Sequence, residues 1–210
     1  MDVRDSQGIA EFISSIPSIM GGLHFCINCS GILGKDYDND LANQPEENWD
    51  MVLDINLKAP AIITKEAVKV MLKQPPLVSQ LEASGKRKPG TCTRRGVIVN
   101  LGSSASLRAR SASGSPYIVS KHGLLGLTKS TAVSYGKQGI RCNVLAPGFV
   151  NTPLIAGIAN KVREIAEGIV PVGRPAEPEE VADQIVYLCS ERASYLNGII
   201  MPVDGGWSCT

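Results

Sequence analysis

The sequence predicts an α/β fold in which helices cover both faces of a doubly wound parallel sheet. Residues 96–101 form an apolar, β-branched run that is typical of a strand buried on both faces. A second strand is predicted over residues 140–145, and a helical pattern over residues 117–135 lies between the two. Strands that alternate with helices of this length indicate a parallel sheet.

Size, charge and apolar content favour a single cytoplasmic domain over residues 1–210. A chain of this length can bury a sizeable core in one domain. A net charge of +1 provides no field that would attract nucleic acid or an anionic membrane. No apolar run reaches the roughly 18 residues of a membrane span, and the N-terminus has no apolar signal-peptide core. We therefore expect neither a nucleic-acid partner nor a membrane partner.

The six cysteines indicate neither a disulfide framework nor a metal site. Cys26 and Cys29 have C-x-x-C spacing, but they lie at the end of a predicted strand. The chain has two histidines, His24 and His122, and no second Cys/His pair accompanies the motif. We interpret both cysteines as small strand residues in a reducing compartment.

The N-terminal elements follow from caps and periodicity. Asp5 or Ser6 can cap a helix that runs to about Met20 and ends at Gly21-Gly22. Its predicted apolar face consists of Ile9, Phe12, Ile13 and Ile16. A strand over residues 23–28 comes next, followed by a polar loop. Pro45 then opens a helix, which breaks near Asn56 and continues over residues 57–72.

The later elements are separated by two longer connections. Residues 74–95 contain five basic residues within positions 86–95, which could form a nucleic-acid patch. Because no aromatic residues are interleaved with them, we favour a solvated insertion. Residues 153–170 are expected to form a mobile lid over a substrate. A helix then begins at Pro178, and the last strand covers residues 198–203.

The centre of the chain carries a pair of residues suited to acid–base chemistry. Tyr117 and Lys121 are four residues apart on the predicted helix, so their side chains share a face. Free tyrosine has a pKa of about 10, and a nearby ammonium would lower that pKa toward the useful range. Ser103, at the end of the strand over residues 96–101, can hydrogen-bond an alcohol or carbonyl oxygen. The alternative for Tyr117 and Lys121 alone is an ordinary surface pair.

These residues belong to a longer set of motifs with a fixed order. The set consists of Asn28-Cys-Ser30-Gly31, Asp54-Ile-Asn56, Asn100-Leu-Gly-Ser103, Tyr117-Ile-Val-Ser-Lys121, Asn143 to Pro147-Gly148-Phe-Val150-Asn-Thr152, and Asp204-Gly-Gly-Trp207. In order and spacing, over residues 2–207, the chain resembles the classical short-chain dehydrogenase/reductase family. The resemblance implies a Rossmann-like fold with strand order 3-2-1-4-5-6-7, homo-oligomers and an NAD or NADP cofactor.

The resemblance also implies a role for each motif. The catalytic residues would be Asn56, Ser103, Tyr117 and Lys121. The cofactor-binding residues would be Asp2, Val3, Asn28, Ser30, Gly31, Tyr117, Lys121, Pro147, Gly148, Val150 and Thr152. The implied reaction transfers a hydride between nicotinamide and a carbonyl or secondary alcohol, as in 3-oxoacyl reductases and alcohol or hydroxysteroid dehydrogenases.

One departure from the family pattern concerns the start of the sequence. Asp2-Val3 matches the end of the family's third strand, where the aspartate meets the adenine of the cofactor. No Thr-Gly-x-x-x-Gly-x-Gly turn occurs in the 210 residues, although this turn holds the pyrophosphate in the family. We therefore expect the first βαβαβ half to be absent. The alternative function is a catalytically silent family member that acts as an interaction partner or has no function.

Overall fold

A four-stranded parallel sheet forms the centre of the molecule. The computed structural model describes residues 1–35, 40–90, 93–109, 114–154 and 159–210. The strands are β1 (Phe25–Asn28), β2 (Gly96–Leu101), β3 (Ile140–Pro147) and β4 (Ile200–Val203). They pair in the order β1-β2-β3-β4, with every pair parallel. This order confirms the α/β class and matches positions 4-5-6-7 of the predicted sheet.

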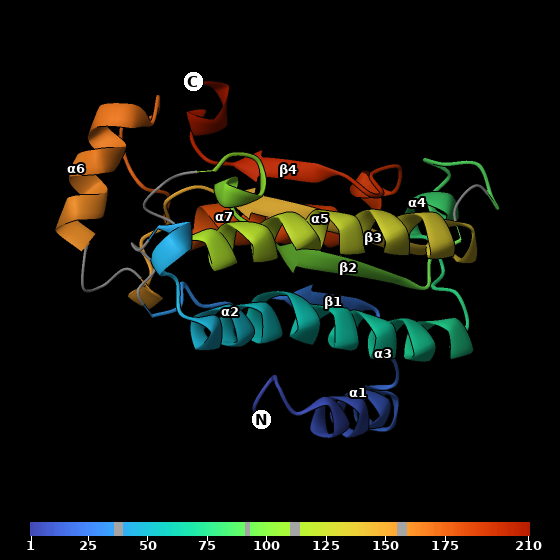
Figure 1. The fold of residues 1–210 in the computed structure, drawn as a ribbon. Coiled ribbons are helices and arrows are strands. Elements are labelled where there is room, and N and C mark those ends of the chain that lie inside the picture. The colour runs from blue at the N-terminus through green and yellow to red at the C-terminus, as the bar shows by residue number, and fades with distance from the viewer. Residues whose placement is uncertain (36–39, 91–92, 110–113, 155–158) are drawn as a thin grey trace.

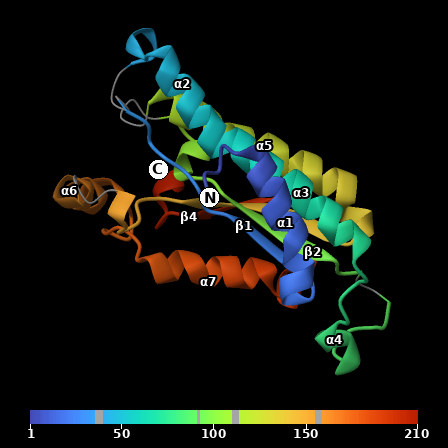
Figure 2. The same cartoon turned by 90° about the horizontal axis from the view of Figure 1, so that it is seen from below.

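Helices cover the sheet on both sides (Figures 1 and 2). One face carries α1 (Ser6–Met20), α2 (Glu46–Leu53), α3 (Ala59–Lys73) and α5 (Ser115–Tyr135). The other face carries α7 (Pro178–Cys189). Two further helices, α4 (Gln80–Ala83) and α6 (Ala159–Ile169), lie at opposite ends of the sheet. No helix within the described ranges is long and apolar enough to cross a membrane.

The predicted boundaries of α1 are confirmed, but one residue of its predicted apolar face is not buried. The Asp5 side chain accepts hydrogen bonds from two backbone N–H groups of the first turn, and Gly21 ends the helix at φ 77°. Ile9 and Ile13 are buried, whereas Phe12 is 55% exposed. Helix α1 packs mainly against α3 through Ile9 and Ile13, and Phe12 lies outside this contact.

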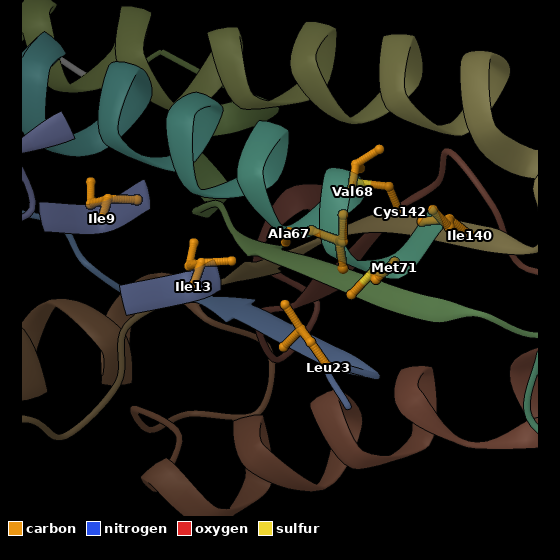
Figure 3. Close-up of a cluster of buried hydrophobic side chains, with 9 residues drawn as sticks. Ile9, Ile13, Leu23, Ala67, Val68, Met71, Ile140 and Cys142 are labelled. Atoms are coloured by element: carbon orange, nitrogen blue, oxygen red, sulfur yellow. The ribbon is translucent and has the colours of Figure 1, made fainter. Parts of the chain in front are cut away.

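Two apolar clusters fill the space on either side of the sheet. The first joins α1, α3 and the strands, and Figure 3 shows Ile9 and Ile13 on one side of Ala67, Val68 and Met71, with Leu23 next to both groups. The second joins β2 and β3 to α7 and consists of Val97, Val99, Leu145, Val181 and Leu188. Successive residues of β2 thus enter opposite clusters, as a strand buried on both faces requires.

A π-helical turn, Asp54–Lys58, separates α2 from α3 at the predicted break. Asn56 lies in this turn and is fully buried. The wider turn places its side chain toward the loop that follows β1 rather than along the helix surface. Such π-turns are frequent at functional sites.

The insertion between α3 and β2 is anchored to the end of α7. Glu191 forms an ion pair with Arg94 at 2.7 Å and accepts a hydrogen bond from Ser79 Oγ at 2.7 Å. The backbone N–H groups of Gln80 and Leu81, at the start of α4, also donate to Glu191. These bonds, led by the one from Ser79, lower the pKa of Glu191 to about 2. At least part of the basic segment therefore serves an internal contact.

Strand β1 leaves two apolar side chains uncovered. Cys26 and Asn28 point toward α1 and α3, so the alternating residues Phe25 and Ile27 point toward the face that carries α7. Helix α7 covers β2 and β3 on that face, but Phe25 and Ile27 remain 46% and 38% exposed. No other strand of the described residues pairs with the free edge of β1. An apolar, unpaired edge is a template for association with another chain.

We predict that residues 1–210 expressed alone self-associate through β1. The double substitution Phe25→Lys and Ile27→Lys should shift the protein toward the monomer in size-exclusion chromatography, because charge on an exposed edge opposes strand pairing. Val133→Lys is the matched control, since Val133 is 85% exposed on α5 and distant from the edge. A monodisperse, monomeric parent chain would contradict the prediction.

Candidate active site

Three of the four predicted catalytic residues line one cavity at the carboxyl ends of the strands. The cavity has a volume of about 430 Å³, within the usual range of small-molecule sites. Ser103, Tyr117 and Lys121 all line it. Parallel strands end at the same edge of the sheet, which explains why motifs separated in sequence meet here.

Ser103 lies two residues beyond β2 and faces Tyr117. Its hydroxyl accepts a hydrogen bond from the Ala105 backbone N–H at 3.1 Å, and this contact starts a short 3-10 turn. The Ser103 hydroxyl is also hydrogen-bonded to the Tyr117 phenol. Ser104 lines the cavity as well, but it is Ser103, the predicted serine, that contacts the phenol.

Lys121 is a buried cation beside the phenol. The residue is 4% exposed, and Nζ donates a hydrogen bond to the Leu101 carbonyl at 2.8 Å. Nζ lies 5.5 Å from the centroid of the Tyr117 ring. Burial disfavours the charged ammonium and lowers the pKa of Lys121 from 10.5 to about 8. Tyr117 and Lys121, at positions i and i+4 of α5, thus lie on one face of the helix, and both line the cavity.

The expected lowering of the Tyr117 pKa is wrong for this structure. Burial raises the pKa of the phenol above its usual value of 10.0, and the hydrogen bond with Ser103 only partly opposes the increase. The expectation took into account only the charge of the Lys121 ammonium. Burial of Tyr117 destabilises the phenolate, and this effect is the larger one. The phenol is consequently protonated at neutral pH and is prepared to donate a proton rather than to accept one.

Asn56 lies behind the cavity and fixes the loop after β1. Its Oδ1 accepts a hydrogen bond from the Ile32 N–H at 2.8 Å, and its Nδ2 donates to the Ile32 carbonyl at 2.9 Å. Nδ2 also lies 3.2 Å from Ser120 Oγ on α5. The asparagine thus holds a backbone carbonyl and joins three segments of the site, but it is not among the described residues that line the cavity.

Two further asparagines form a hydrogen bond between β1 and β2 beneath the site. Asn28 and Asn100 lie opposite each other in the β1–β2 register. Asn28 Nδ2 donates to Asn100 Oδ1 at 2.7 Å, and Asn100 Nδ2 donates to Thr128 Oγ1 of α5 at 2.7 Å. Asn28 Oδ1 is buried and has no hydrogen-bond partner. Asn28 therefore braces the strands from below the cavity.

Several predicted cofactor residues line the cavity and leave room for a flat group. These are Gly31, Pro147, Gly148, Val150 and Thr152. A Cβ on Gly31 would lie 3.4 Å from Lys121 Nζ and 3.5 Å from Asn56 Oδ1, so a side chain there would occupy the space beside the ammonium. The cavity therefore fits the nicotinamide and ribose half of a dinucleotide, with Lys121 as the polar contact.

The other predicted cofactor residues do not reach the cavity. Asp2, Val3, Asn28 and Ser30 are not among the described residues that line it. Asp2 is exposed and forms an ion pair with Arg4 at 2.6 Å, which holds the pKa of the Asp2 carboxyl at about 2. A role of Asp2 and Val3 at the adenine stays a prediction.

Sequence reasoning missed much of the cavity wall. Phe149 and Trp207 line the cavity and stack on each other, with ring centroids 5.3 Å apart. Leu154, Val162 and Val181 complete the apolar part. Trp207 belongs to the Asp204-Gly-Gly-Trp207 motif, so its position in a signature was the available signal. No local pattern marks an apolar residue as a wall of a site rather than as core.

Comparison with known proteins agrees with this geometry. A family model described as enoyl-(acyl carrier protein) reductase matches residues 1–88 and 78–208. A short-chain dehydrogenase of Aspergillus ruber is 35% identical over 214 residues, which cover 100% of this chain and 76% of the relative. The 3-oxoacyl-[acyl-carrier-protein] reductase of Thermotoga maritima is 32% identical over 206 residues, which cover 98% and 74%. The chain belongs to the short-chain dehydrogenase/reductase family.

Solved structures of similar proteins extend the comparison to the cofactor. The structure of ElxO with NADP bound has a TM-score of 0.83 and 26% identity, and the match covers 100% of this chain and 77% of that one. The chain thus spans about three quarters of the length of the relatives it matches. The members of this short-chain dehydrogenase/reductase family are oxidoreductases, and the α/β fold of the present chain is theirs.

We predict that Lys121 lowers the stability of the fold at neutral pH. Its folded pKa of about 8 lies below its unfolded value of 10.5, so the unfolded chain binds more protons between these pH values. Stability therefore rises with pH through this window, and the full penalty, roughly 3 kcal/mol, applies below pH 8. After allowing about 1 kcal/mol for the lost hydrogen bond, Lys121→Met should stabilise the chain by about 2 kcal/mol at pH 7.

Guanidinium denaturation at pH 7 and pH 10 measures this effect. The stability gain of Lys121→Met should fall to near zero at pH 10, where the folded lysine is already neutral. The exposed lysine of the same helix, Lys129, provides the control, and Lys129→Met should change stability little at either pH. An equal gain at both pH values would mean that hydrophobic packing, not the buried charge, explains the result.

Proposed function

We propose that the chain is an NAD(P)-dependent oxidoreductase that interconverts a carbonyl compound and a secondary alcohol. The observation that carries the proposal is the contact between Ser103 and Tyr117 beside the buried Lys121, inside a cavity. A hydroxyl, a phenol and an ammonium at one point can hold a carbonyl oxygen and transfer one proton to it. Family membership supports the reaction type.

The residues divide the proton chemistry among them. Bound NAD(P)H supplies the hydride for the carbonyl carbon and becomes NAD(P)⁺, while the oxygen takes a proton; in the oxidation both steps reverse. Tyr117 donates that proton, and its raised pKa keeps it protonated until a substrate oxygen is present. Ser103 orients the same oxygen. Lys121 would hold the nicotinamide ribose and stabilise the phenolate that remains.

Asn56 has a positioning role in this scheme. By holding the Ile32 carbonyl at 2.9 Å and Ser120 at 3.2 Å, it fixes the backbone next to Lys121. A water held by that carbonyl would return a proton to Tyr117 through Lys121. The cofactor can be NAD or NADP, and 3-oxoacyl compounds and hydroxysteroids are both carbonyl/alcohol pairs of the proposed type. A homo-oligomer is part of the proposal.

A catalytically silent protein is the second candidate function, and it concerns residues 1–210 taken by themselves. The 210 residues contain no glycine-rich turn for the pyrophosphate. Loss of two or three charge-assisted hydrogen bonds, at ~1.5–3 kcal/mol each, would weaken cofactor binding by roughly 3–9 kcal/mol. This corresponds to at least about a hundredfold in affinity.

We predict that residues 1–210 alone do not bind NADH or NADPH measurably at micromolar concentration. Joining the chain behind a βαβαβ unit with a glycine-rich turn gives the extended chain, which should bind at least about a hundredfold more tightly. Titration followed by nicotinamide fluorescence measures both affinities. An extension whose turn glycines are replaced by alanine is the control. Micromolar affinity of the 210-residue chain would contradict the prediction.

We predict that Tyr117→Phe in the extended chain abolishes carbonyl reduction and leaves cofactor affinity nearly unchanged. Phenylalanine keeps the ring but has no proton to transfer, and acid catalysis typically contributes 10²–10⁴-fold. Steady-state oxidation of NADPH with a ketone substrate measures the loss. Tyr195→Phe serves as the control, because Tyr195 is fully exposed. If Tyr117→Phe kept more than about a tenth of the activity, Tyr117 would be excluded as the acid. If the unsubstituted extended chain bound cofactor but was inactive, the catalytically silent protein would be favoured.

A further inference from the structure

The part of the cavity wall beyond the Ser103–Tyr117 pair is aromatic and aliphatic. Phe149 follows the end of β3, and Trp207 begins the short C-terminal turn Trp207–Cys209. Their rings are 27° from parallel, and Trp207 is 8% exposed. Leu154 and Val162 lie on the same cavity from the segment that precedes α6 and from α6 itself. We call Phe149, Leu154, Val162 and Trp207 the apolar wall, because together they offer an apolar surface to part of a substrate.

The aromatic pair is held in place by its surroundings. The Arg108 side chain donates a hydrogen bond to the Trp207 carbonyl at 3.1 Å. The backbone N–H of Trp207 donates to the Asp204 carbonyl, also at 3.1 Å. Trp207 also packs with the buried residues Ala166 and Val170 of the segment that includes α6. The indole is thus fixed before a ligand arrives, so little side-chain entropy is lost when a ring stacks on it.

Among the described residues of the apolar wall, none carries a charge that would balance a negative charge on a substrate. Among the described lining residues, Lys121 is the only one with a positive charge at neutral pH. Its Nζ already donates to the Leu101 carbonyl and lies beside the reacting phenol. A carboxylate or phosphate placed against the apolar wall would lose its hydration without a cationic partner, which is strongly unfavourable.

We propose that the substrate is a neutral ketone or secondary alcohol with an apolar ring, which contains or adjoins the reacting carbon and is seated against the apolar wall. This assignment rests on the proposed carbonyl/alcohol function and specifies its substrate class. The oxygen lies at Ser103 and Tyr117, and the ring extends toward Phe149 and Trp207, where stacking and burial stabilise it. Ketones that carry a carboxylate or several hydroxyls on the same part of the molecule are excluded by desolvation.

Trp207 provides a direct readout of this binding without cofactor or turnover. The chain has two tryptophans, so the Trp49→Phe variant leaves Trp207 as the sole fluorescent reporter. This variant is titrated with 4-tert-butylcyclohexanone and with 4-oxocyclohexanecarboxylate, which differ in the group opposite the carbonyl. Free N-acetyltryptophanamide corrects for collisional quenching by ketones. We expect a saturable change in Trp207 emission and an affinity at least about tenfold higher for the neutral ketone.

A charge placed in the wall tests the cause of this preference. Leu154 lines the cavity and is 55% exposed, so Leu154→Arg should be tolerated by the fold. It should bring the affinity for 4-oxocyclohexanecarboxylate to at least that for the neutral ketone. Val133→Arg, at a position 85% exposed on α5, is the matched control and should leave both affinities unchanged.

Each result supports or overturns the assignment. Equal affinities, tighter binding of the carboxylate, or no saturable binding of either ketone to the parent would overturn it. So would an unchanged preference in Leu154→Arg. Because the titrations contain no NAD(P)H, a failure of hydride transfer leaves them unaffected. Conversely, an active enzyme that prefers the carboxylate would preserve the proposed function and remove only the substrate class.

Discussion

The hydrogen bond between Asn28 and Asn100 is the constraint on which the rest of the site depends. Parallel pairing places the two asparagines opposite each other at the buried ends of β1 and β2, where amide groups must find partners within the protein. Asn28 also contacts Thr64 of α3, and Asn100 contacts Thr128 of α5. The pair therefore sets the position of α5 against the sheet, and α5 carries Tyr117 and Lys121. Asn56 adds a second tie from the π-turn to the same helix through Ser120.

The site contains a buried charge that lowers the stability of the fold, and the apolar core around it offsets this cost. A buried ammonium weakens the folded state at neutral pH, and Lys121 Nζ donates a hydrogen bond to the Leu101 carbonyl at the end of β2. The same burial raises the pKa of the Tyr117 phenol and keeps it protonated at neutral pH. Residues that act on a ligand are commonly less than optimal for stability, and the surrounding core compensates. Here the clusters on both faces of the sheet provide that compensation.

Sequence reasoning reached the elements that local patterns encode. The β-branched run of β2, the Asp5 cap and Gly21 end of α1, the break at Asn56 and the four-residue spacing of Tyr117 and Lys121 are all local, and the structure has each of them. Properties that depend on distant neighbours were not accessible. The exposure of Phe12 depends on where α3 packs, the uncovered side of Phe25 depends on the reach of α7, and the pKa of Tyr117 depends on desolvation by segments far apart in the chain. The stacking of Phe149 on Trp207, 58 positions later, has no local signature.

The central claim is that this cavity directs a hydride to a carbonyl carbon while Tyr117 supplies the proton. Incubation of the extended chain with a ketone and NADPH deuterated at nicotinamide C4, on the face from which hydride leaves, tests it most directly. Mass spectrometry and NMR of the alcohol locate the label, and both C4 epimers of the cofactor are used in separate reactions. The account predicts one deuterium on the carbinol carbon from one epimer only, with the hydroxyl proton derived from solvent. Alcohol without deuterium at that carbon from either epimer, or no alcohol from a chain shown to bind both ligands, would contradict it.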